Sequence, residues 1–328
     1  TVQAVEDTGE TDPLFADMRV QRVEVRLSKG SEDIVAEYTD DRKTDADDLS
    51  IGLKVVVLKT QAFVGQTRYI ITDVYRLPAV LWLLVLFFVA AIVFAGRKGF
   101  MSLLGLGVSL GILVVYTVPA IVQGVAPFFV ATVSAFAIAI LSITLAHGFS
   151  KQTGIALTST LITLMLSLGL SEFFVDTARL FGLGTEDAYS LSLAGLSGID
   201  LRGLLLAVII IGTLGVLDDV TTTQTASVKS LADAGVRGFG KLYRASASVG
   251  TEHIVSLDNT LALAYAGASL PLLLLFSLNE GQSPAWMILN SQMLTEEIVR
   301  TLVGSTALVL AVPISTVCAT WWYTRRQS

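Results

Sequence analysis

The chain has 328 residues, of which 53% are hydrophobic and 15% charged, and its formal net charge is −6. Soluble domains carry about 25% charged residues, so this composition excludes an ordinary soluble protein if the apolar residues form long runs. The single cysteine, Cys318, excludes an internal disulfide framework and a cysteine-rich metal site. Residue 1 is Thr rather than Met, which indicates a trimmed chain and leaves room for a preceding signal peptide or membrane helix.

The first region, residues 1–77, is polar and rich in strand signals. Residues 23–27 alternate Val and Leu with Glu and Arg, which is the pattern of a half-buried strand. A turn signal follows, so residues 34–38 are expected to return as the second strand of a hairpin. Residues 53–58 and 69–75 favour two further strands. Together these patterns predict a small β-domain.

The β-domain carries 15 acidic and 10 basic residues, and it contains an acidic loop at residues 40–48. This loop could bind a cation loosely. An ordinary solvated loop is the favoured interpretation, because the spacing of the carboxylates matches no EF-hand pattern.

The second region, residues 78–328, contains apolar runs long enough to cross a bilayer, which takes about 17–25 residues per helix. Seven runs qualify by this criterion: 78–95, 100–118, 127–146, 153–170, 201–217, 257–278 and 298–320. The predicted fold class is a polytopic α-helical membrane bundle of about seven transmembrane helices, preceded by a small extracytoplasmic β-domain.

The basic residues predict the orientation of this bundle, because cytoplasmic connections carry an excess of Lys and Arg. Arg97 and Lys98 lie in the first connection, Lys151 in the third, and further basic residues in 218–256 and in the tail. We therefore expect a cell-membrane protein with its N-terminal domain outside and its C-terminus in the cytoplasm. The outer connection 171–200 is expected to form two short helices, the second of them capped by Thr185.

The inner segment 218–256 has the most distinctive sequence. The apolar helix 201–217 is expected to end at two adjacent carboxylates, and a second helix is expected to stop at Gly235. Arg237, Lys241 and Arg244 follow at the i, i+4 and i+7 positions of a helix. A basic face beside a membrane favours contact with anionic inner-leaflet lipids. Three basic residues supply too little positive charge to bind the phosphates of a nucleic acid, so no nucleic-acid partner is expected.

Ionisable residues gather at the expected cytoplasmic ends of the spans. They are His147, Asp218, Asp219, Glu252, His253 and Asp258, with polar support from Thr222, Thr223, Gln224 and Asn259. Carboxylates and imidazoles suit a divalent cation or a proton relay. The competing interpretation is that these residues only cap helices and fix topology. No zinc-protease, nucleophile-elbow, P-loop or dinucleotide motif points to an enzyme or to a cofactor.

Of the paired carboxylates, Asp219 is expected to face the bundle. Successive helix positions lie about 100° apart, so the two side chains cannot point the same way. Leu205, Ile209, Gly212 and Gly215 precede Asp219 on a stripe that suits helix contact. This arrangement would bring Asp219 and His253 into one site.

Four segments resemble the YibE/F family of prokaryotic multi-pass membrane proteins. They read LGVLDDVT at 214–221, AHGFS at 146–150, LAYAGA at 263–268 and EEIVRTL at 296–302. The resemblance implies a membrane helix before an extracellular β-domain and a polytopic bundle after it. Where the family usually has Asp-His-Ile, this chain has Glu-His-Ile at 252–254. The resemblance implies architecture and no defined activity.

These observations favour a transporter-like protein for a small ion or solute, with an Asp/His site on the cytoplasmic side. The alternative is a non-transporting scaffold or stress-response regulator that acts through protein or lipid contacts, and either protein could be a homo-oligomer. Transport predicts carboxylates beside a solvated cavity between the fifth and sixth spans. A scaffold predicts carboxylates paired with Lys or Arg and no cavity.

Overall fold

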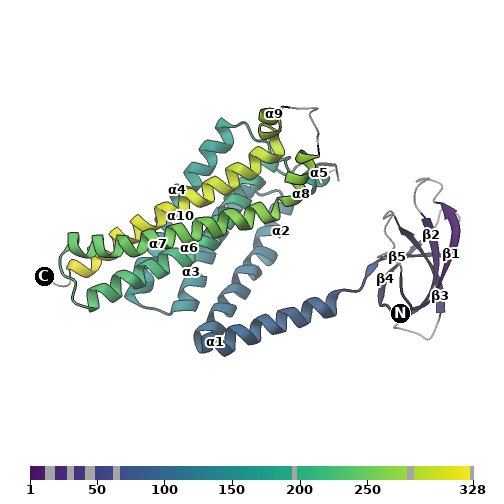
Figure 1. Ribbon diagram of the computed structural model, residues 1–328, viewed down its shortest axis with the longest axis horizontal. Coiled ribbons are helices and arrows are strands. Elements are labelled where there is room, and N and C mark those ends of the chain that lie inside the picture. Colours follow the sequence, from purple (N-terminus) through teal and green to yellow (C-terminus); the bar gives the residue numbers. More distant parts are fainter. Residues whose placement is uncertain are drawn as a thin grey trace. The chain divides into compact units, whose positions relative to one another are not determined.

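The computed structural model describes residues 1–11, 19–27, 33–40, 49–61, 67–193, 198–278 and 284–325 (Figure 1). The chain divides into two compact units, Thr1–Ala90 and Ala91–Ser328. The first unit contains the β-sheet and the beginning of the first helix, and the second contains the rest of the helices.

The N-terminal unit is built on a five-stranded sheet with the order β1-β2-β3-β5-β4. The strands are β1 (Val2–Thr11), β2 (Arg19–Arg26), β3 (Asp33–Asp40), β4 (Val55–Gln61) and β5 (Thr67–Val74). The predicted hairpin is confirmed: β2 and β3 pair antiparallel, with Val23 opposite Ala36. Both side chains are buried in the core of the sheet, because period-two alternation turns them to the same face.

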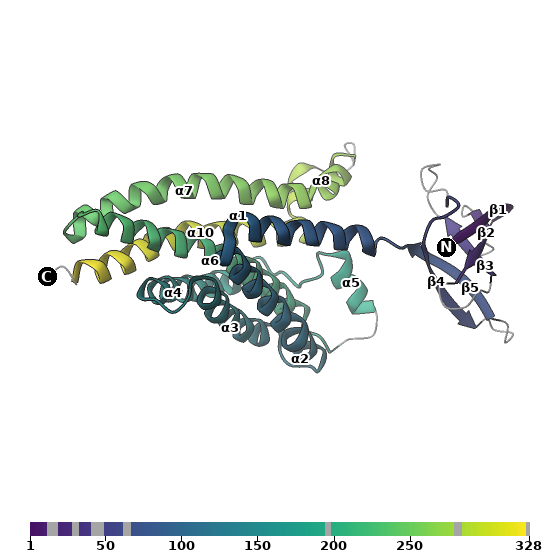
Figure 2. The ribbon, with the colours of Figure 1, turned by 90° about the horizontal axis from the view of Figure 1, so that it is seen from below.

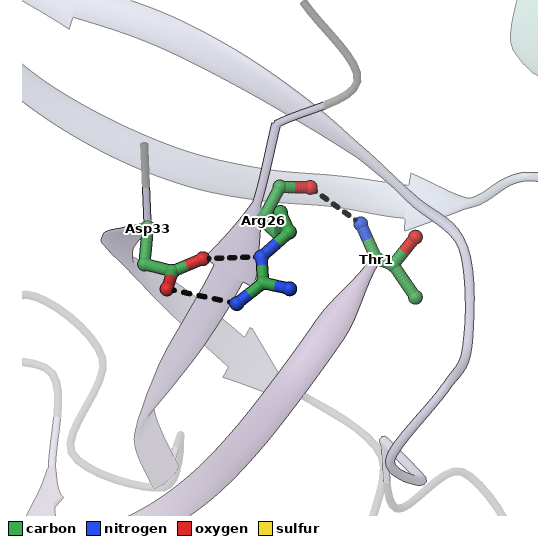
Figure 3. Close-up of polar contacts among 3 residues, drawn as sticks. All are labelled: Thr1, Arg26 and Asp33. Atoms are coloured by element: carbon green, nitrogen blue, oxygen red, sulfur yellow. Dashed lines mark hydrogen bonds and ion pairs between the residues drawn. The ribbon is translucent and has the colours of Figure 1, made fainter. Parts of the chain in front are cut away.

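Polar contacts close the end of this hairpin (Figure 3). The Arg26 guanidinium donates to both carboxylate oxygens of Asp33, at 2.8 and 3.1 Å, and the backbone nitrogen of Thr1 donates to the carbonyl of Arg26 at 2.8 Å. The Arg26 hydrogen bonds lower the pKa of the Asp33 carboxyl. Residues 41–48, most of the acidic loop, lie outside the described residues.

The remainder of the described chain is largely helical, and Figures 1 and 2 show the helices labelled α6, α7 and α10 running alongside one another. The helices are α1 (Leu77–Ile112), the π-helical turn η2 (Leu113–Thr117), α2 (Val118–Val122), α3 (Pro127–His147), α4 (Lys151–Thr177), α5 (Glu186–Leu193), α6 (Leu201–Asp233), α7 (Phe239–Ala268), α8 (Leu270–Ser277), α9 (Ala285–Leu289) and α10 (Gln292–Arg325).

Among the helices of the described residues, five are long and apolar enough to cross a membrane: Leu77–Val122, Pro127–His147, Lys151–Thr177, Leu201–Asp233 and Gln292–Arg325. The first counts as one helix but is interrupted at Gly96, whose φ of 57° and ψ of −137° are not helical. Its 46 residues would measure about 69 Å if straight, well beyond the ~30 Å core of a bilayer. The break therefore separates two apolar halves, close to the predicted spans 78–95 and 100–118.

Three of the sequence-based boundaries are wrong. The helix expected to end before Asp218 continues as α6 to Asp233, and α7 runs without a break across the expected start of a span at residue 257. Residues 172–177 extend α4 rather than starting a separate helix. On α6 the polar residues that follow Asp219 did not stop the helix, because Thr221, Gln224 and Thr225 are buried against other helices. The expected stop at Gly235 is confirmed by its φ of 93°, and Thr185 caps α5 at the amide of Ala188.

The core of the helical unit lies where α3, α4, α6 and α10 meet. Leu164, Ile210, Leu217 and Leu308 are all buried there. Hydroxyls line the same interfaces: Thr160 on α4 and Thr221 on α6 lie 2.6 Å apart. Small hydroxyl-bearing residues let helices approach closely and hydrogen-bond within a membrane. This packing holds α6, and with it Asp218 and Asp219, in a fixed rotation.

Candidate functional site

Asp218 lies on α6 and faces the C-terminal half of α3. Ser142 Oγ donates to Asp218 Oδ2 at 3.2 Å, and His147 and Asp219 are the ionisable neighbours of this carboxylate. The other carboxylate oxygen, Oδ1, is buried and has no hydrogen-bond partner among the described residues. A buried carboxylate oxygen without a donor is costly, which marks Asp218 as a functional candidate.

A polar pocket of about 610 Å³ lies one helical turn further along α6. It is formed by α1, the end of α3, the start of α4, and Thr222 of α6. Its polar lining consists of Arg97, Lys98, His147, Ser150, Gln152, Thr153 and Thr222. The volume falls within the range of small-molecule sites, about 300–1,000 Å³.

Asp218 and the pocket are connected through α6 and α3. Thr222 follows Asp218 by four positions, so both occupy the same face of α6, and Thr222 Oγ1 donates to the Asp218 carbonyl at 2.9 Å. His147 lines the pocket from α3 and also neighbours the Asp218 carboxylate. A carboxylate on α6 and an exposed imidazole on α3 are therefore near the same polar cavity, an arrangement that can bind and release protons or ions.

The preference for Asp219 as the inward residue is wrong. Asp219 is exposed, whereas Asp218 is partly buried. Gly212 and Gly215, the small residues expected to face a neighbouring helix, are exposed as well. The apolar core is on the opposite side of α6, at Leu214 and Leu217.

His253 does not join the aspartates in a direct contact. It is half-buried on α7, and its Nε2 atom has no hydrogen-bond partner in the described part of the chain. Glu252 and Asn259, also on α7, are exposed. The side chain of Asp258 lies outside the described residues. The expected cavity between the fifth and sixth spans differs from the pocket found, because His147 and Thr222 line a pocket on the α1–α3–α4 side of α6.

The polar residues after Asp219 have different surroundings. Gln224 is buried and donates from Nε2 to the Ser246 carbonyl at 2.9 Å and to Thr316 Oγ1 at 2.8 Å, so it joins α6 to α7 and α10. Thr223 is half-buried, and its carbonyl accepts from Ser227 Oγ. Of these supporting residues, Thr222 is therefore the one that reaches the pocket.

The basic face predicted from Arg237, Lys241 and Arg244 contains fewer residues than expected. Arg237 precedes α7 and is separated from it by Gly238, whose φ is 85°, so it cannot continue the helical spacing. Lys241 and Arg244 lie three positions apart on α7, and both are exposed.

Sequence reasoning missed two features of the helical unit. Ser142 donates to Asp218 across 76 positions of sequence, and nothing in its local pattern distinguishes it from other serines in apolar helices. Glu296 is buried, and its carboxylate accepts from the amides of Gly182 and Gly184 at 3.0 and 3.1 Å. The sequence signal for Glu296 was a carboxylate just before the apolar run 298–320.

Within the described residues, no group of three or more His, Cys, Asp or Glu side chains is arranged to hold a metal ion. Asp218 accepts a hydrogen bond from the Ser142 hydroxyl, and the exposed His147 and Asp219 are its charged or chargeable neighbours.

Comparison with known proteins identifies the family. No curated protein and no solved structure matches the chain. The YibE/F-like protein family matches residues 83–325, which includes every helix of the bundle from within α1 to the last turn of α10. The match covers well over half of the chain and includes Asp218, His147 and the polar pocket, so the chain belongs to the YibE/F-like family.

Proposed function

We propose that this multi-pass membrane protein transports a small ion or solute through the polar pocket, with Asp218 and His147 as the pair that exchanges a proton or cation. The observation that carries the proposal is the buried, unpartnered Oδ1 of Asp218, one helical turn from a pocket of about 610 Å³. Ionisable groups inside membrane helices are costly, and they typically mark ion or substrate paths.

The environment of Asp218 favours transport over a scaffold. A scaffold would have its carboxylates paired with Lys or Arg, and neither Asp218 nor Asp219 has such a partner in the described chain. Asp218 instead has a weak donor on one oxygen and none on the other. It can therefore change partners without breaking the helix packing around it.

The proposal includes an orientation. Arg97 and Lys98 at the break in α1, and Lys151 at the start of α4, put the polar pocket on the cytoplasmic side of a cell membrane by the charge rule. The N-terminal sheet is then extracytoplasmic. Contact of Lys241 and Arg244 with anionic inner-leaflet lipids, binding of a divalent cation, and self-association of the chain are additional parts of the proposal.

The test of transport compares two neighbouring carboxylates. The full chain would be reconstituted in liposomes loaded with a pH-sensitive dye and challenged with a panel of divalent cations and small anions. Asp218→Asn is expected to abolish the flux that the unmodified chain supports. Asp219→Asn makes the same chemical change at an exposed position, and its flux is expected to stay within about twofold. Equal loss in both variants, or full flux in Asp218→Asn, contradicts the assignment.

The orientation can be tested by cysteine labelling in a Cys318→Ser background. Ser190 and Ser248 are exposed, whereas Ser246 is fully buried and would be a poor reporter. A cysteine at 190 is expected to react with an impermeant reagent added outside intact cells. A cysteine at 248 should react only after the inner face is opened to the reagent, and the reverse pattern would contradict the orientation.

A further inference from the structure

The charges on the polar pocket identify the kind of ligand that it fits. Arg97, Lys98 and His147 line it, and no Asp or Glu is present among its described lining residues. Neither Arg97 nor Lys98 forms an ion pair or side-chain hydrogen bond within the described chain. Two permanent positive charges therefore border a cavity without a protein carboxylate to neutralise them.

The backbone around the pocket adds to this positive character. Ser150, Gln152 and Thr153 line the pocket, so the N-terminus of the 27-residue helix α4, with the positive end of its dipole, borders it. Ser150 caps this helix by accepting from the amide of Thr153 at 3.1 Å. The hydroxyls of Ser150 and Thr153, 2.8 Å apart, and the amide of Gln152 supply neutral donors.

The corner that carries the two basic residues is fixed by its glycines. Gly96 has a φ of 57°, which L side chains rarely adopt. At Gly99 a Cβ would lie 2.2 Å from the carbonyl oxygen of Ala91, so no larger residue fits there. Arg97 and Lys98 lie between these two glycines, on a tight turn that holds their backbone in place.

We infer that the polar pocket binds an oxyanion, the shared chemistry of free phosphate, sulfate and a phospholipid headgroup. Guanidinium and ammonium groups with hydroxyl and amide donors are the usual ligands of such anions. The inference rests on the proposed function and names its substrate class. Asp218 lies close to the same pocket, so protonation of Asp218 removes a repulsion and is expected to favour anion binding.

The experiment measures equilibrium binding of radiolabelled inorganic phosphate to the full chain in nanodiscs of zwitterionic lipid. Saturable binding is expected. Arg97→Gln combined with Lys98→Gln should weaken it about tenfold or more, since a single lost charge-assisted hydrogen bond corresponds to about that factor. Lys54→Gln combined with Lys59→Gln removes the same charge from two exposed residues of the N-terminal unit that do not line the pocket, and it should change binding by less than about twofold.

A second arm distinguishes the two sources of the anion. In nanodiscs that contain phosphatidylglycerol, a fall in phosphate binding that requires Arg97 and Lys98 assigns the site to a lipid headgroup. Unchanged phosphate binding assigns it to a free anion. Either result supports an oxyanion site, and both variant pairs are first checked for unchanged thermal unfolding.

The inference is overturned if neither phosphate nor sulfate binds saturably, or if both variant pairs weaken binding equally. Its failure is distinguishable from failure of the transport proposal. If a cation crosses the membrane in an Asp218-dependent way and phosphate does not bind, only the oxyanion assignment is rejected. If phosphate binding depends on Arg97 and Lys98 but no ion crosses the membrane, only the transport proposal is rejected.

Discussion

Asp218 on α6 and Glu296 on α10 are two carboxylates in neighbouring helices of one bundle, and their surroundings differ. Glu296 accepts three hydrogen bonds, from the amides of Gly182 and Gly184 and from the side chain of Gln292 at 2.8 Å. Asp218 accepts one side-chain hydrogen bond, at 3.2 Å, and its second oxygen is buried without a donor. A carboxylate whose oxygens are both used by fixed donors holds structure together. One with an unused buried oxygen is available for a ligand or a proton.

The loop that Glu296 holds supports the structural assignment. A Cβ on Gly184 would lie 2.5 Å from Glu296 Oε2, and a Cβ on Gly182 would lie 2.1 Å from the Leu201 carbonyl oxygen. Only glycine fits at both positions, so the loop is shaped around the carboxylate and the start of α6. Glu296 therefore ties the connection after α4 to the beginning of α10, while Gly182 in the same connection packs against the first residue of α6.

The largest expected effect on stability is at Glu296. Glu296→Ala leaves the buried amides of Gly182 and Gly184 without their acceptor, which should lower the free energy of unfolding by about 3 kcal/mol. Glu296→Gln keeps the size of the side chain and one acceptor oxygen, so it should lose less. Thermal unfolding of the full chain in detergent measures both, and equal stability of Glu296→Ala and the unmodified chain would contradict the structural role.

A smaller effect compares two threonines on α6. Thr221 Oγ1 lies 2.6 Å from Thr160 Oγ1, whereas the buried Thr225 Oγ1 has no partner among the described residues. Thr221→Val should therefore destabilise the bundle by about 1 kcal/mol, and Thr225→Val should be neutral or slightly stabilising. The same unfolding measurement separates them, and the opposite order would show that the hydroxyl contact does not contribute.

The smallest effect concerns pH and the exposed Asp33. Because Arg26 lowers the pKa of Asp33 in the folded sheet, this pair stabilises the sheet above the unfolded pKa of about 3.9. The contribution is lost as the pH falls through the lower, folded pKa. In the Asp33→Asn variant, the protection of the β2 and β3 amides from hydrogen exchange should therefore fall less below about pH 4 than it does in the unmodified chain. Unchanged acid sensitivity would show that other carboxylates dominate.

The contrast between Asp218 and Glu296 also shows what sequence could predict. Local patterns were sufficient for the β2–β3 hairpin, the Thr185 cap and the stop at Gly235, because each depends on residues a few positions apart. They were also sufficient to select the Asp218–Asp219 pair as a candidate. They could not decide between the two residues, since that choice depends on which face of α6 meets α3.

The remaining differences have the same physical origin. Gly212 and Gly215 indicated a contact face, but both are exposed, and a Cβ on Gly212 would lie 3.8 Å from the Tyr265 hydroxyl of α7. A long side chain therefore reaches this face, rather than a closely packed helix backbone. The two backbone amides that donate to Glu296 lie more than a hundred positions earlier, at Gly182 and Gly184. Such partners are set by tertiary packing, which a single sequence does not specify.

The most direct test of the central claim measures flux and thermal unfolding together in Asp218→Asn and Glu296→Gln. The account predicts that Asp218→Asn abolishes ion flux in proteoliposomes while it unfolds at the same temperature as the unmodified chain. Glu296→Gln should unfold at a lower temperature, and its folded fraction should retain flux. An Asp218→Asn variant that unfolds early, or that transports normally, would contradict the claim that Asp218 is the functional carboxylate of the bundle.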